Sequence, residues 1–190
     1  MTRLYPTLRP HRYALLILHP TEAIDLVEYG RANLLAEATR AAGFDRVVVV
    51  YPNNDPGSGG IIRAWEDLRH DERFALEKDI ARPDFLGLLR DAAVLVGNSS
   101  SGIIEAASFG TPVIDVEDRQ AGRERSRNVR NVPFDSARLG TALRRAWSGG
   151  KAPRWKGVNV YGGDGAGKRM ANLLAAVDLG PGVRRKLITY

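Results

Sequence analysis

The stretch VGNSSSGIIE, from Val96 to Glu105, places three serine hydroxyls and two glycines between an apolar run and a segment with helical spacing. Glycines let a ligand approach the backbone. Serine hydroxyls and free N–H groups at the start of a helix donate hydrogen bonds, and the helix dipole favours negative charge there. Glu105 follows about one turn later, where its carboxylate could accept hydrogen bonds from the vicinal hydroxyls of a ribose. Phosphate donors beside a sugar acceptor predict a nucleotide site.

A simpler interpretation is that the serines only cap the following helix, which is the commoner role of an isolated serine-rich turn. Two features weaken that interpretation. Three hydroxyls are more than one cap requires, and capping does not explain the carboxylate of Glu105. The residues alone leave both interpretations open.

Alternating apolar runs and helix-like segments predict where this loop lies. Continuous apolar runs, typical of strands buried on both faces, occupy 13–18, 46–51, 92–97 and 111–116, with a weaker run at 74–76. Helical spacing occupies 22–42, capped by Thr21, and also 82–89, 101–109, 136–147 and 166–177. This alternation predicts an α/β fold with a doubly wound parallel sheet.

Ligands of open parallel sheets bind beyond the carboxyl ends of the strands, and VGNSSSGIIE lies at such an end. His19 closes the first apolar run in the same way, although a histidine at a helix entry can also serve a local backbone hydrogen bond. Asn53 and Asp55 follow the second run, in a Pro/Gly-rich turn that turn formation alone would explain. His19 is therefore a stronger candidate than Asn53 for a ligand site at this edge of the sheet.

Composition limits the classes of function. A chain of 190 residues with 44% hydrophobic content can bury one core, and we expect a domain over 13–178 between a linker-like segment, 1–12, and a basic tail, 179–190. The absence of cysteine excludes disulfides, thiolate metal sites and thiol catalysis, and it favours a reducing, cytoplasmic location. No apolar run approaches the roughly 20 residues of a membrane span, so no membrane partner is expected.

The formal charge of +6 favours an anionic partner. A run of arginines at 119, 123, 125, 127 and 130 could contact nucleic acid, but no aromatic platform or nucleic-acid motif accompanies it, so we expect no nucleic-acid partner. The histidines at 11, 19 and 70 lack ligand spacing, so we expect no metal. Residues 162–168 match part of a phosphate-binding P-loop, but Arg169 replaces the Ser/Thr that should follow, which argues against an ATP site.

Four blocks of the chain resemble, in the same order, the second domain of UDP-N-acetylglucosamine 2-epimerases. They are LLILHPTE at 15–22, YPNNDPGS at 51–58, VGNSSSGIIEAASFGTPVIDVEDRQAGRERSRNV from Val96, and NVYGGDGAGKRM at 159–170. The resemblance runs from about residue 12 to residue 177. It is strongest to the hydrolysing branch of the family, which releases N-acetylmannosamine.

This resemblance implies the Rossmann-like second half of a glycosyltransferase-B-type architecture, with a UDP-sugar bound between two halves. It implies that Ser99 and Ser100 contact the diphosphate, Glu105 the ribose, and Arg119 the nucleotide or the sugar. His19 and Asn53 match positions that the family places at the substrate, and His19 is the candidate catalytic residue. The family requires no cofactor.

The family's reaction begins with removal of the proton at sugar C2 and departure of UDP, which gives a glycal; water then adds in the hydrolysing branch. The acid and base come mainly from the first domain, which this chain lacks. We therefore expect a fragment of a longer enzyme, a half completed by a separate chain or within a homo-oligomer, or a UDP-binding module without turnover. A non-hydrolysing epimerase half and a UDP-sugar glycosyltransferase half remain alternatives.

Overall fold

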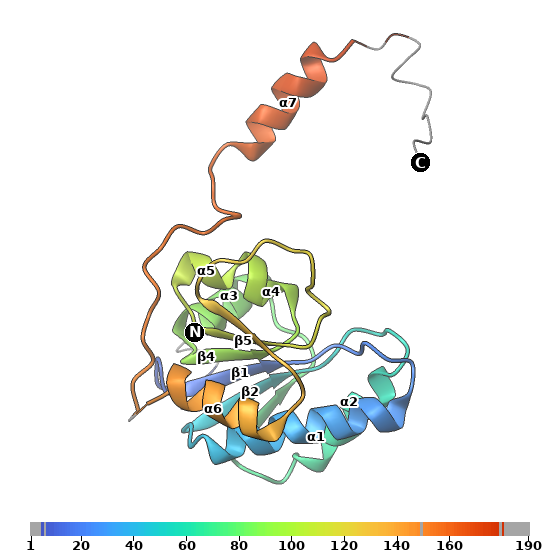
Figure 1. Ribbon diagram of the computed structural model, residues 1–190, viewed down its shortest axis with the longest axis vertical. Helices are drawn as coiled ribbons and strands as arrows, with labels where there is room; N and C mark the ends of the chain where they lie inside the picture. The colour runs from blue at the N-terminus through green and yellow to red at the C-terminus, as the bar shows by residue number, and fades with distance from the viewer. Residues whose placement is uncertain (1–4, 6, 149, 179, 181–190) are drawn as a thin grey trace. The chain divides into compact units, whose positions relative to one another are not determined.

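The apolar runs of the sequence form the strands of one sheet, and most segments with helical spacing form helices (Figure 1). The computed structural model describes residues 5, 7–148, 150–178 and 180. The predicted basic tail, 179–190, lies outside these residues apart from Gly180. The chain divides into two units, Met1–Val160 and Tyr161–Tyr190, and only the last helix belongs to the second. Nowhere in the described part does a helix combine the length and apolar character needed to cross a bilayer.

The elements in chain order are β1 (Tyr13–Ile17), α1 (Asp25–Ala41), β2 (Arg46–Val50), α2 (Ser58–Asp67), β3 (Phe74–Glu77), α3 (Arg82–Asp91), β4 (Val94–Gly97), α4 (Ser100–Ile104), α5 (Ala106–Phe109), β5 (Val113–Val116), β6 (Val129–Val132), α6 (Ser136–Ala146) and α7 (Ala166–Ala176).

The strands form one parallel sheet in the order β3-β2-β1-β4-β5-β6. From β1 the chain proceeds outward to β2 and β3, then returns to place β4 on the other side of β1. The direction of winding therefore reverses between β1 and β4, where Ile17 lies opposite Gly97. This is the Rossmann strand order with its topological switch point, and it confirms the predicted doubly wound α/β fold.

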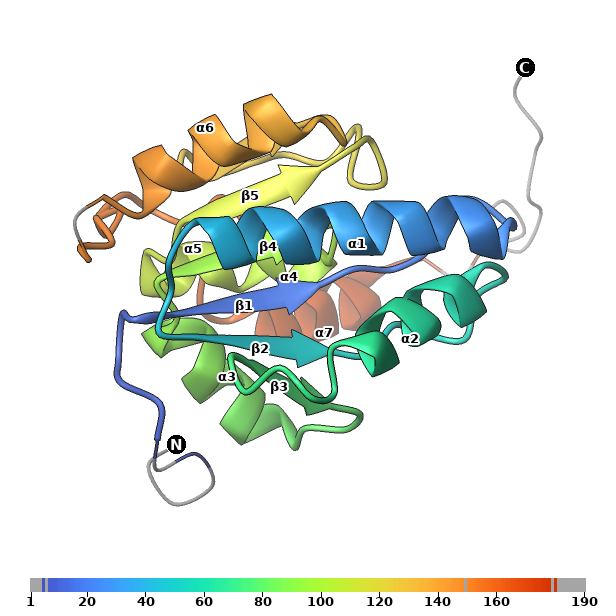
Figure 2. The same cartoon turned by 90° about the horizontal axis from the view of Figure 1, so that it is seen from below.

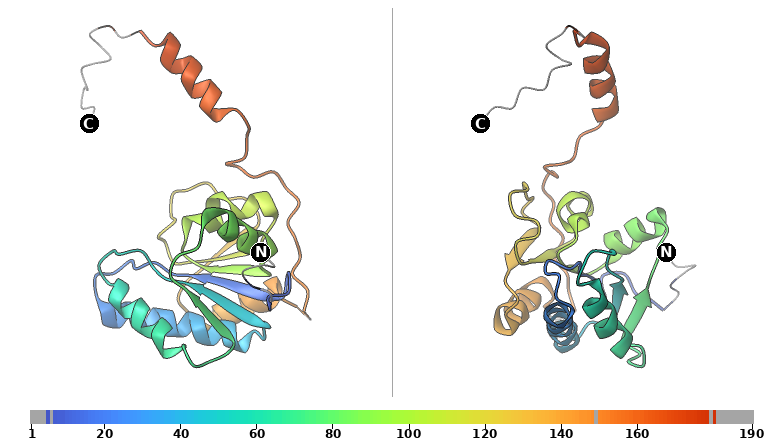
Figure 3. Two further views of the ribbon diagram at one scale, coloured as in Figure 1. Left: turned by 180° about the vertical axis from the view of Figure 1, so that it is seen from behind. Right: turned by 90° about the vertical axis from the view of Figure 1, so that its right-hand side faces the viewer.

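Helices cover both faces of the sheet. On one face α1, α2 and α6 pack against side chains such as Leu16, Val49 and Val96 (Figure 2). On the other face α3 and α5 pack against Leu15 and Val48 (Figure 3). Because successive strand residues point to opposite faces, a sheet covered on both sides buries every residue of its central strands, and these strands appear in the sequence as unbroken apolar runs.

The predicted cap of the first helix was wrong. α1 begins at Asp25, and Ile24 at its N-cap position makes no side-chain hydrogen bond. Thr21 instead donates its backbone N–H to the Glu28 carboxylate at 3.0 Å. The chain leaving β1 crosses the carboxyl edge of the sheet before it can turn back along the sheet as α1, so the helix starts later than the first favourable cap residue.

The helix predicted over 101–109 is divided at Glu105 into α4 and α5. The N–H of Ser108 turns to the carbonyl of Glu105, and the Asn159 side chain donates to the carbonyl of Ile104 and to the hydroxyl of Ser108, both at 2.8 Å. A distant side chain thus satisfies the carbonyl that a continuous helix would have used, and local spacing cannot reveal this break.

Two elements were missed by the sequence patterns. α2 starts with Ser58 and two glycines, which weaken any helical pattern, yet a Cβ at Gly60 would lie 1.9 Å from the carbonyl oxygen of Asp25. The glycine therefore serves the close approach of α2 to α1. β6 is an edge strand whose middle residues, Arg130 and Asn131, are exposed, so it lacks an apolar run.

Gly97 ends β4 with φ +130°, and a Cβ there would lie 1.8 Å from the carbonyl oxygen of Ile17. We expect Gly97→Ala to lower the free energy of unfolding by about 2–4 kcal/mol, because it adds both backbone strain and a clash inside the sheet. Gly30→Ala is the control: Gly30 lies within α1 with nothing within 4 Å of its Cβ position, so alanine there should stabilise by about 0.5–1 kcal/mol. Urea unfolding of both variants measures the difference, and similar values would contradict the argument.

Candidate functional site

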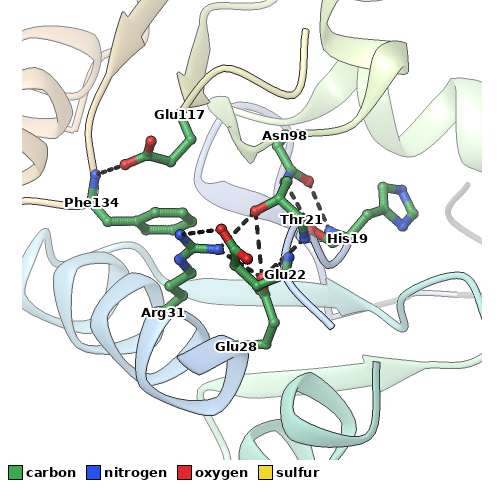
Figure 4. Close-up of polar contacts among 8 residues, drawn as sticks. All are labelled: His19, Thr21, Glu22, Glu28, Arg31, Asn98, Glu117 and Phe134. Carbon is green, nitrogen blue, oxygen red and sulfur yellow. Dashed lines mark hydrogen bonds and ion pairs between the residues drawn. The ribbon is translucent and has the colours of Figure 1, made fainter. Parts of the chain in front are cut away.

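The buried amide of Asn98 joins the loops that leave the two strands of the switch point. Asn98 follows β4 and is fully buried. Its Oδ1 accepts the backbone N–H of His19 at 2.8 Å, and its Nδ2 donates to the carbonyl of His19 at 2.8 Å (Figure 4). Its own N–H donates to the carbonyl of Ile17 at 3.1 Å. These bonds continue the pairing of β1 and β4 one step beyond the sheet and fix His19 beside the serine loop.

The same residue anchors the loop that follows β5. The carbonyl of Asn98 accepts a hydrogen bond from Arg119 at 3.2 Å and another from the Gln120 side chain at 2.8 Å. Arg125 in turn donates to the carbonyl of Gln120 at 3.0 Å. The loops after β1, β4 and β5 therefore meet at one backbone position, and Arg119 brings a positive charge to it.

Arg125 also pairs with a buried carboxylate at the end of β5. Asp115 is 1% exposed, and its Oδ2 accepts from Arg125 at 3.3 Å and from Asn131 at 3.0 Å. Burial raises the pKa of Asp115, while the bonds from Asn131 and the charge of Arg125 oppose that shift. Two members of the arginine run, Arg119 and Arg125, thus make contacts inside the fold, which accounts for part of the positive charge without a nucleic-acid partner.

The His19 imidazole is held in one protonation state. Its Nδ1 accepts the backbone N–H of Asn53 at 3.1 Å, so in the neutral ring the proton resides on Nε2. Burial and the nearby charge of Arg119 lower the pKa of His19 to about 4, although the charge of Asp55 and the side chain of Asn53 act in the opposite direction. At neutral pH the ring is uncharged and Nδ1 is occupied. His19 is therefore better suited to donate its Nε2 hydrogen to a ligand oxygen than to act as a general base.

The serine loop partly supports the simpler capping interpretation. Ser99 is the N-cap of α4: its hydroxyl accepts the N–H of Ser101 at 3.3 Å and lies 2.9 Å from the Ser101 hydroxyl. Ser100 is half-buried, and its hydroxyl has no hydrogen-bond partner among the described residues. Within this loop, Ser100 is therefore the side chain that is available to a ligand.

Glu105 stands slightly apart from the other predicted residues. Its carboxylate lies 3.4 Å from Arg82, whose side chain is 72% exposed. No side-chain bond in the described part of the chain joins Glu105 to His19, Asn53, Ser99 or Arg119, although its N–H donates to the carbonyl of Ser101 at 3.1 Å. Of the six predicted residues, the loops that meet at Asn98 carry His19, Ser99, Ser100 and Arg119, and Asn53 binds the ring of His19. Glu105 lies one short helix away.

Sequence reasoning missed several residues that build this arrangement. Asn98 lies within VGNSSSGIIE, and the signal that could have identified it is a polar residue directly after a buried strand. Gln120 and Asn159 had no such signal, because their roles depend on distant backbone groups. Among the described residues, no group of three or more His, Asp or Glu side chains is arranged to hold a metal ion.

Comparison with known proteins points to one family. The family model described as UDP-N-acetylglucosamine 2-epimerase matches residues 2–175. A UDP-N,N'-diacetylbacillosamine 2-epimerase (hydrolyzing) of Legionella pneumophila is 32% identical over 94% of this chain and 46% of its own length. A UDP-N-acetylglucosamine 2-epimerase of Neisseria meningitidis is 33% identical over 73% of this chain and 36% of its own length. The chain thus spans less than half the length of these relatives.

Two solved structures share the fold. The UDP-GlcNAc 2-epimerase of Methanocaldococcus jannaschii, in complex with UDP-GlcNAc and UDP, has a TM-score of 0.68 at 19% identity, covering 86% of this chain and 45% of that one. The enzyme of Neisseria meningitidis, bound to UDP-GlcNAc, has a TM-score of 0.68 at 16% identity, covering 92% and 47%. At these identities the likeness shows the fold, and it confirms a glycosyltransferase-B-type half.

The lowered pKa of His19 predicts a pH-dependent stability. The unfolded chain takes up a proton near pH 6.5, whereas the folded chain does so only near pH 4, so the protein should lose stability as pH falls through this window. The slope should stay below the roughly 1.4 kcal/mol per pH unit of one fully differential proton, because the imidazole is partly exposed. Unfolding of wild type and His19→Gln between pH 4 and 7 isolates this slope. Parallel plots of unfolding free energy against pH for the two proteins would contradict the lowered pKa of His19.

Removing the Asn98 side chain should loosen His19 in particular. In Asn98→Ala the N–H of His19 loses its acceptor, and we expect its amide hydrogen to exchange about 10- to 100-fold faster. Asn128→Ala is the matched control, because Asn128 is also buried and its Nδ2 donates to the carbonyl of Thr111 at the opposite edge of the sheet. Amide exchange by NMR compares the two; equal acceleration at His19 in both variants would indicate general destabilisation instead.

Proposed function

We propose that this chain, which belongs to the UDP-N-acetylglucosamine 2-epimerase family, is the nucleotide-binding half of a hydrolysing 2-epimerase. The complete enzyme would convert UDP-N-acetylglucosamine and water to N-acetylmannosamine and UDP. The observation that carries the proposal is the meeting of His19, Asn53, Ser99 and Arg119 around Asn98, at the switch point where Rossmann-like sheets bind nucleotides.

The diphosphate is assigned to the start of α4. The Ser100 hydroxyl is available there, whereas the N–H groups of Ser101 and Gly102 already donate to Ser99. α4 and α5 have only five and four residues, so their dipoles contribute little. The charge of Arg119, which the carbonyl of Asn98 holds beside this loop, is the stronger attraction for an anion.

The ribose is assigned to Glu105. Its carboxylate is already ion-paired with Arg82, but that arginine is largely exposed, and exposed pairs contribute little free energy. The carboxylate can therefore accept hydrogen bonds from two vicinal hydroxyls without losing a strong internal interaction.

The reaction itself requires groups beyond those gathered here. Elimination of UDP with loss of the C2 proton needs a positioned acid and base. His19, neutral and carrying its proton on Nε2, is suited to donate a hydrogen bond to the departing diphosphate or to the sugar. We assign the principal acid and base to a first domain, present in the same longer chain or in a separate chain.

The name of the Legionella relative supports the hydrolysing outcome over the non-hydrolysing one. The sugars named for the two relatives differ while UDP is common to both, so the assignment made for this half is UDP itself. A cytoplasmic location agrees with the absence of cysteine and remains a prediction.

Calorimetric titration of the purified chain with UDP tests the proposal, with UMP and inorganic diphosphate as comparison ligands. We expect saturable UDP binding that is tighter than binding of either comparison ligand, because only UDP presents both the diphosphate and the ribose. Equal binding of UDP and diphosphate, or none of UDP even when a homologous first domain is added, would contradict the proposal.

Two variants test the assignment of residues within that titration. Ser100→Ala should weaken UDP by about 1.5–3 kcal/mol through loss of a donor to a charged oxygen. Glu105→Gln should weaken UDP more than diphosphate, because only UDP carries the ribose. Glu37→Gln is the control: it also removes a carboxylate paired with an arginine, near the far end of α1, and should leave affinity unchanged. Unchanged affinity in Ser100→Ala, or equal losses of both ligands in Glu105→Gln, would remove the corresponding assignment.

A further inference from the structure

A fully buried carboxylate lies in the first turn of α1, outside the residues assigned to the ligand. Glu28 is 0% exposed. Its Oε1 accepts the backbone N–H of Thr21 at 3.0 Å and that of Glu22 at 2.8 Å (Figure 4). Burying a charge is costly unless the charge is paired and hydrogen-bonded, so these contacts indicate a specific role for the carboxylate.

The backbone held by Glu28 belongs to the turn that directly follows His19 and Pro20. α1 has no side-chain cap at Ile24, so Glu28 does not serve its own helix start in the usual way. It reaches back to the preceding turn and binds two consecutive N–H groups there. The carboxylate thus fixes the backbone at Thr21 and Glu22, two and three residues after His19.

Arg31 completes this arrangement from the same helix. Its guanidinium donates to Glu28 at 2.7 Å and to the Thr21 hydroxyl at 2.7 Å. The guanidinium also lies over the ring of Phe134, 5.1 Å from the ring centroid, and the N–H of Phe134 is bound by Glu117 at 2.9 Å. The positive charge of Arg31 therefore balances the negative charge of Glu28, and the segment before α6 helps to hold the guanidinium in place.

The turn is packed on its other side by the loop that carries Asn53. Gly57 closes that loop with φ +91°, and a Cβ there would lie 2.1 Å from the carbonyl oxygen of Glu22 and 3.2 Å from Cγ of Glu28. The turn is therefore enclosed between Glu28 and the loop whose Asn53 N–H binds Nδ1 of His19. Moving the turn would disturb both the backbone of His19 and the donor to its ring.

We propose that Glu28 is a positioning residue for His19: it fixes the turn at Thr21 and Glu22, so that Nδ1 stays on the N–H of Asn53 and Nε2 keeps its hydrogen for a ligand. The effect on UDP rests on the function proposed above. The effect on the imidazole does not, and the two can be measured separately in the same protein.

The experiment follows the imidazole of His19 by ¹⁵N NMR in the full chain, assigned with His19→Gln, together with UDP affinity and urea unfolding. In Glu28→Gln we expect His19 to lose its single Nε2–H tautomer and its apparent pKa to rise towards the ordinary value, because the backbone N–H of Asn53 no longer occupies Nδ1, which can then take up a proton. UDP affinity should fall about tenfold. Arg31→Met leaves the Glu28 carboxylate bound to the turn, so it should change the tautomer and the pKa of His19 far less.

The double variant Glu28→Gln/Arg31→Met separates positioning from stability. It removes the arginine charge that the single variant leaves with only the 4.0 Å ion pair to Glu22, so it should recover part of the lost stability and remain folded. The tautomer and pKa of His19 should nevertheless still differ from those of wild type, because the turn still lacks the Glu28 carboxylate. The matched control is Glu37→Gln/Arg40→Met, a pair with the same spacing farther along α1, which should leave His19 unchanged.

A double variant whose His19 tautomer and pKa match those of wild type would overturn the proposal and leave Glu28 a purely structural residue. A changed tautomer or pKa of His19 in the control variant would also overturn the proposal, because any loss of stability would then produce the same effect. If wild type fails to bind UDP while His19 shifts in the Glu28 variants, the function proposed above fails and the positioning role stands.

Discussion

The two hydrogen bonds between the Asn98 side chain and the backbone of His19 are the interaction on which the candidate site depends. At a switch point the loops after neighbouring strands diverge towards helices on opposite faces, so nothing in the sheet itself keeps them together. A buried amide can satisfy both an N–H and a carbonyl at once, and here it replaces the next rung of the β1–β4 pairing. Through the carbonyl of the same residue, the loop after β5 joins the arrangement.

The electrostatics of this edge come from side chains rather than from helix dipoles. The helices after β4 are too short to act as strong dipoles, whereas Arg119 and Arg125 are fixed by contacts to Asn98, Gln120 and Asp115. These contacts leave the imidazole of His19 beside a positive charge in a partly buried place, which keeps the ring neutral. An edge that combines a fixed cation with neutral hydrogen-bond donors is complementary to the diphosphate proposed as its ligand.

The chain supplies groups that hold and orient rather than a complete set for acid–base chemistry. The central residues are supported by others: His19 by Asn53 and Asn98, and the Asn98 loop by Gln120. The division of the helix at Glu105, maintained by Asn159, likewise sets the direction of the carboxylate assigned to the ribose. Such double support suits the nucleotide-binding half proposed above.

The sequence by itself determined the parallel sheet, the order of most of its strands and helices, and the family. Unbroken apolar runs arise only where a strand is covered on both faces, and the blocks around His19, Asn53 and Ser99 lie at the ends of those runs. Tertiary structure decided the burial of Asn98 and Glu28, the break at Glu105, the late start of α1 and the edge strand β6. Each of these depends on a hydrogen bond or contact with residues beyond the local repeat, and short-range periodicity carries no record of such partners.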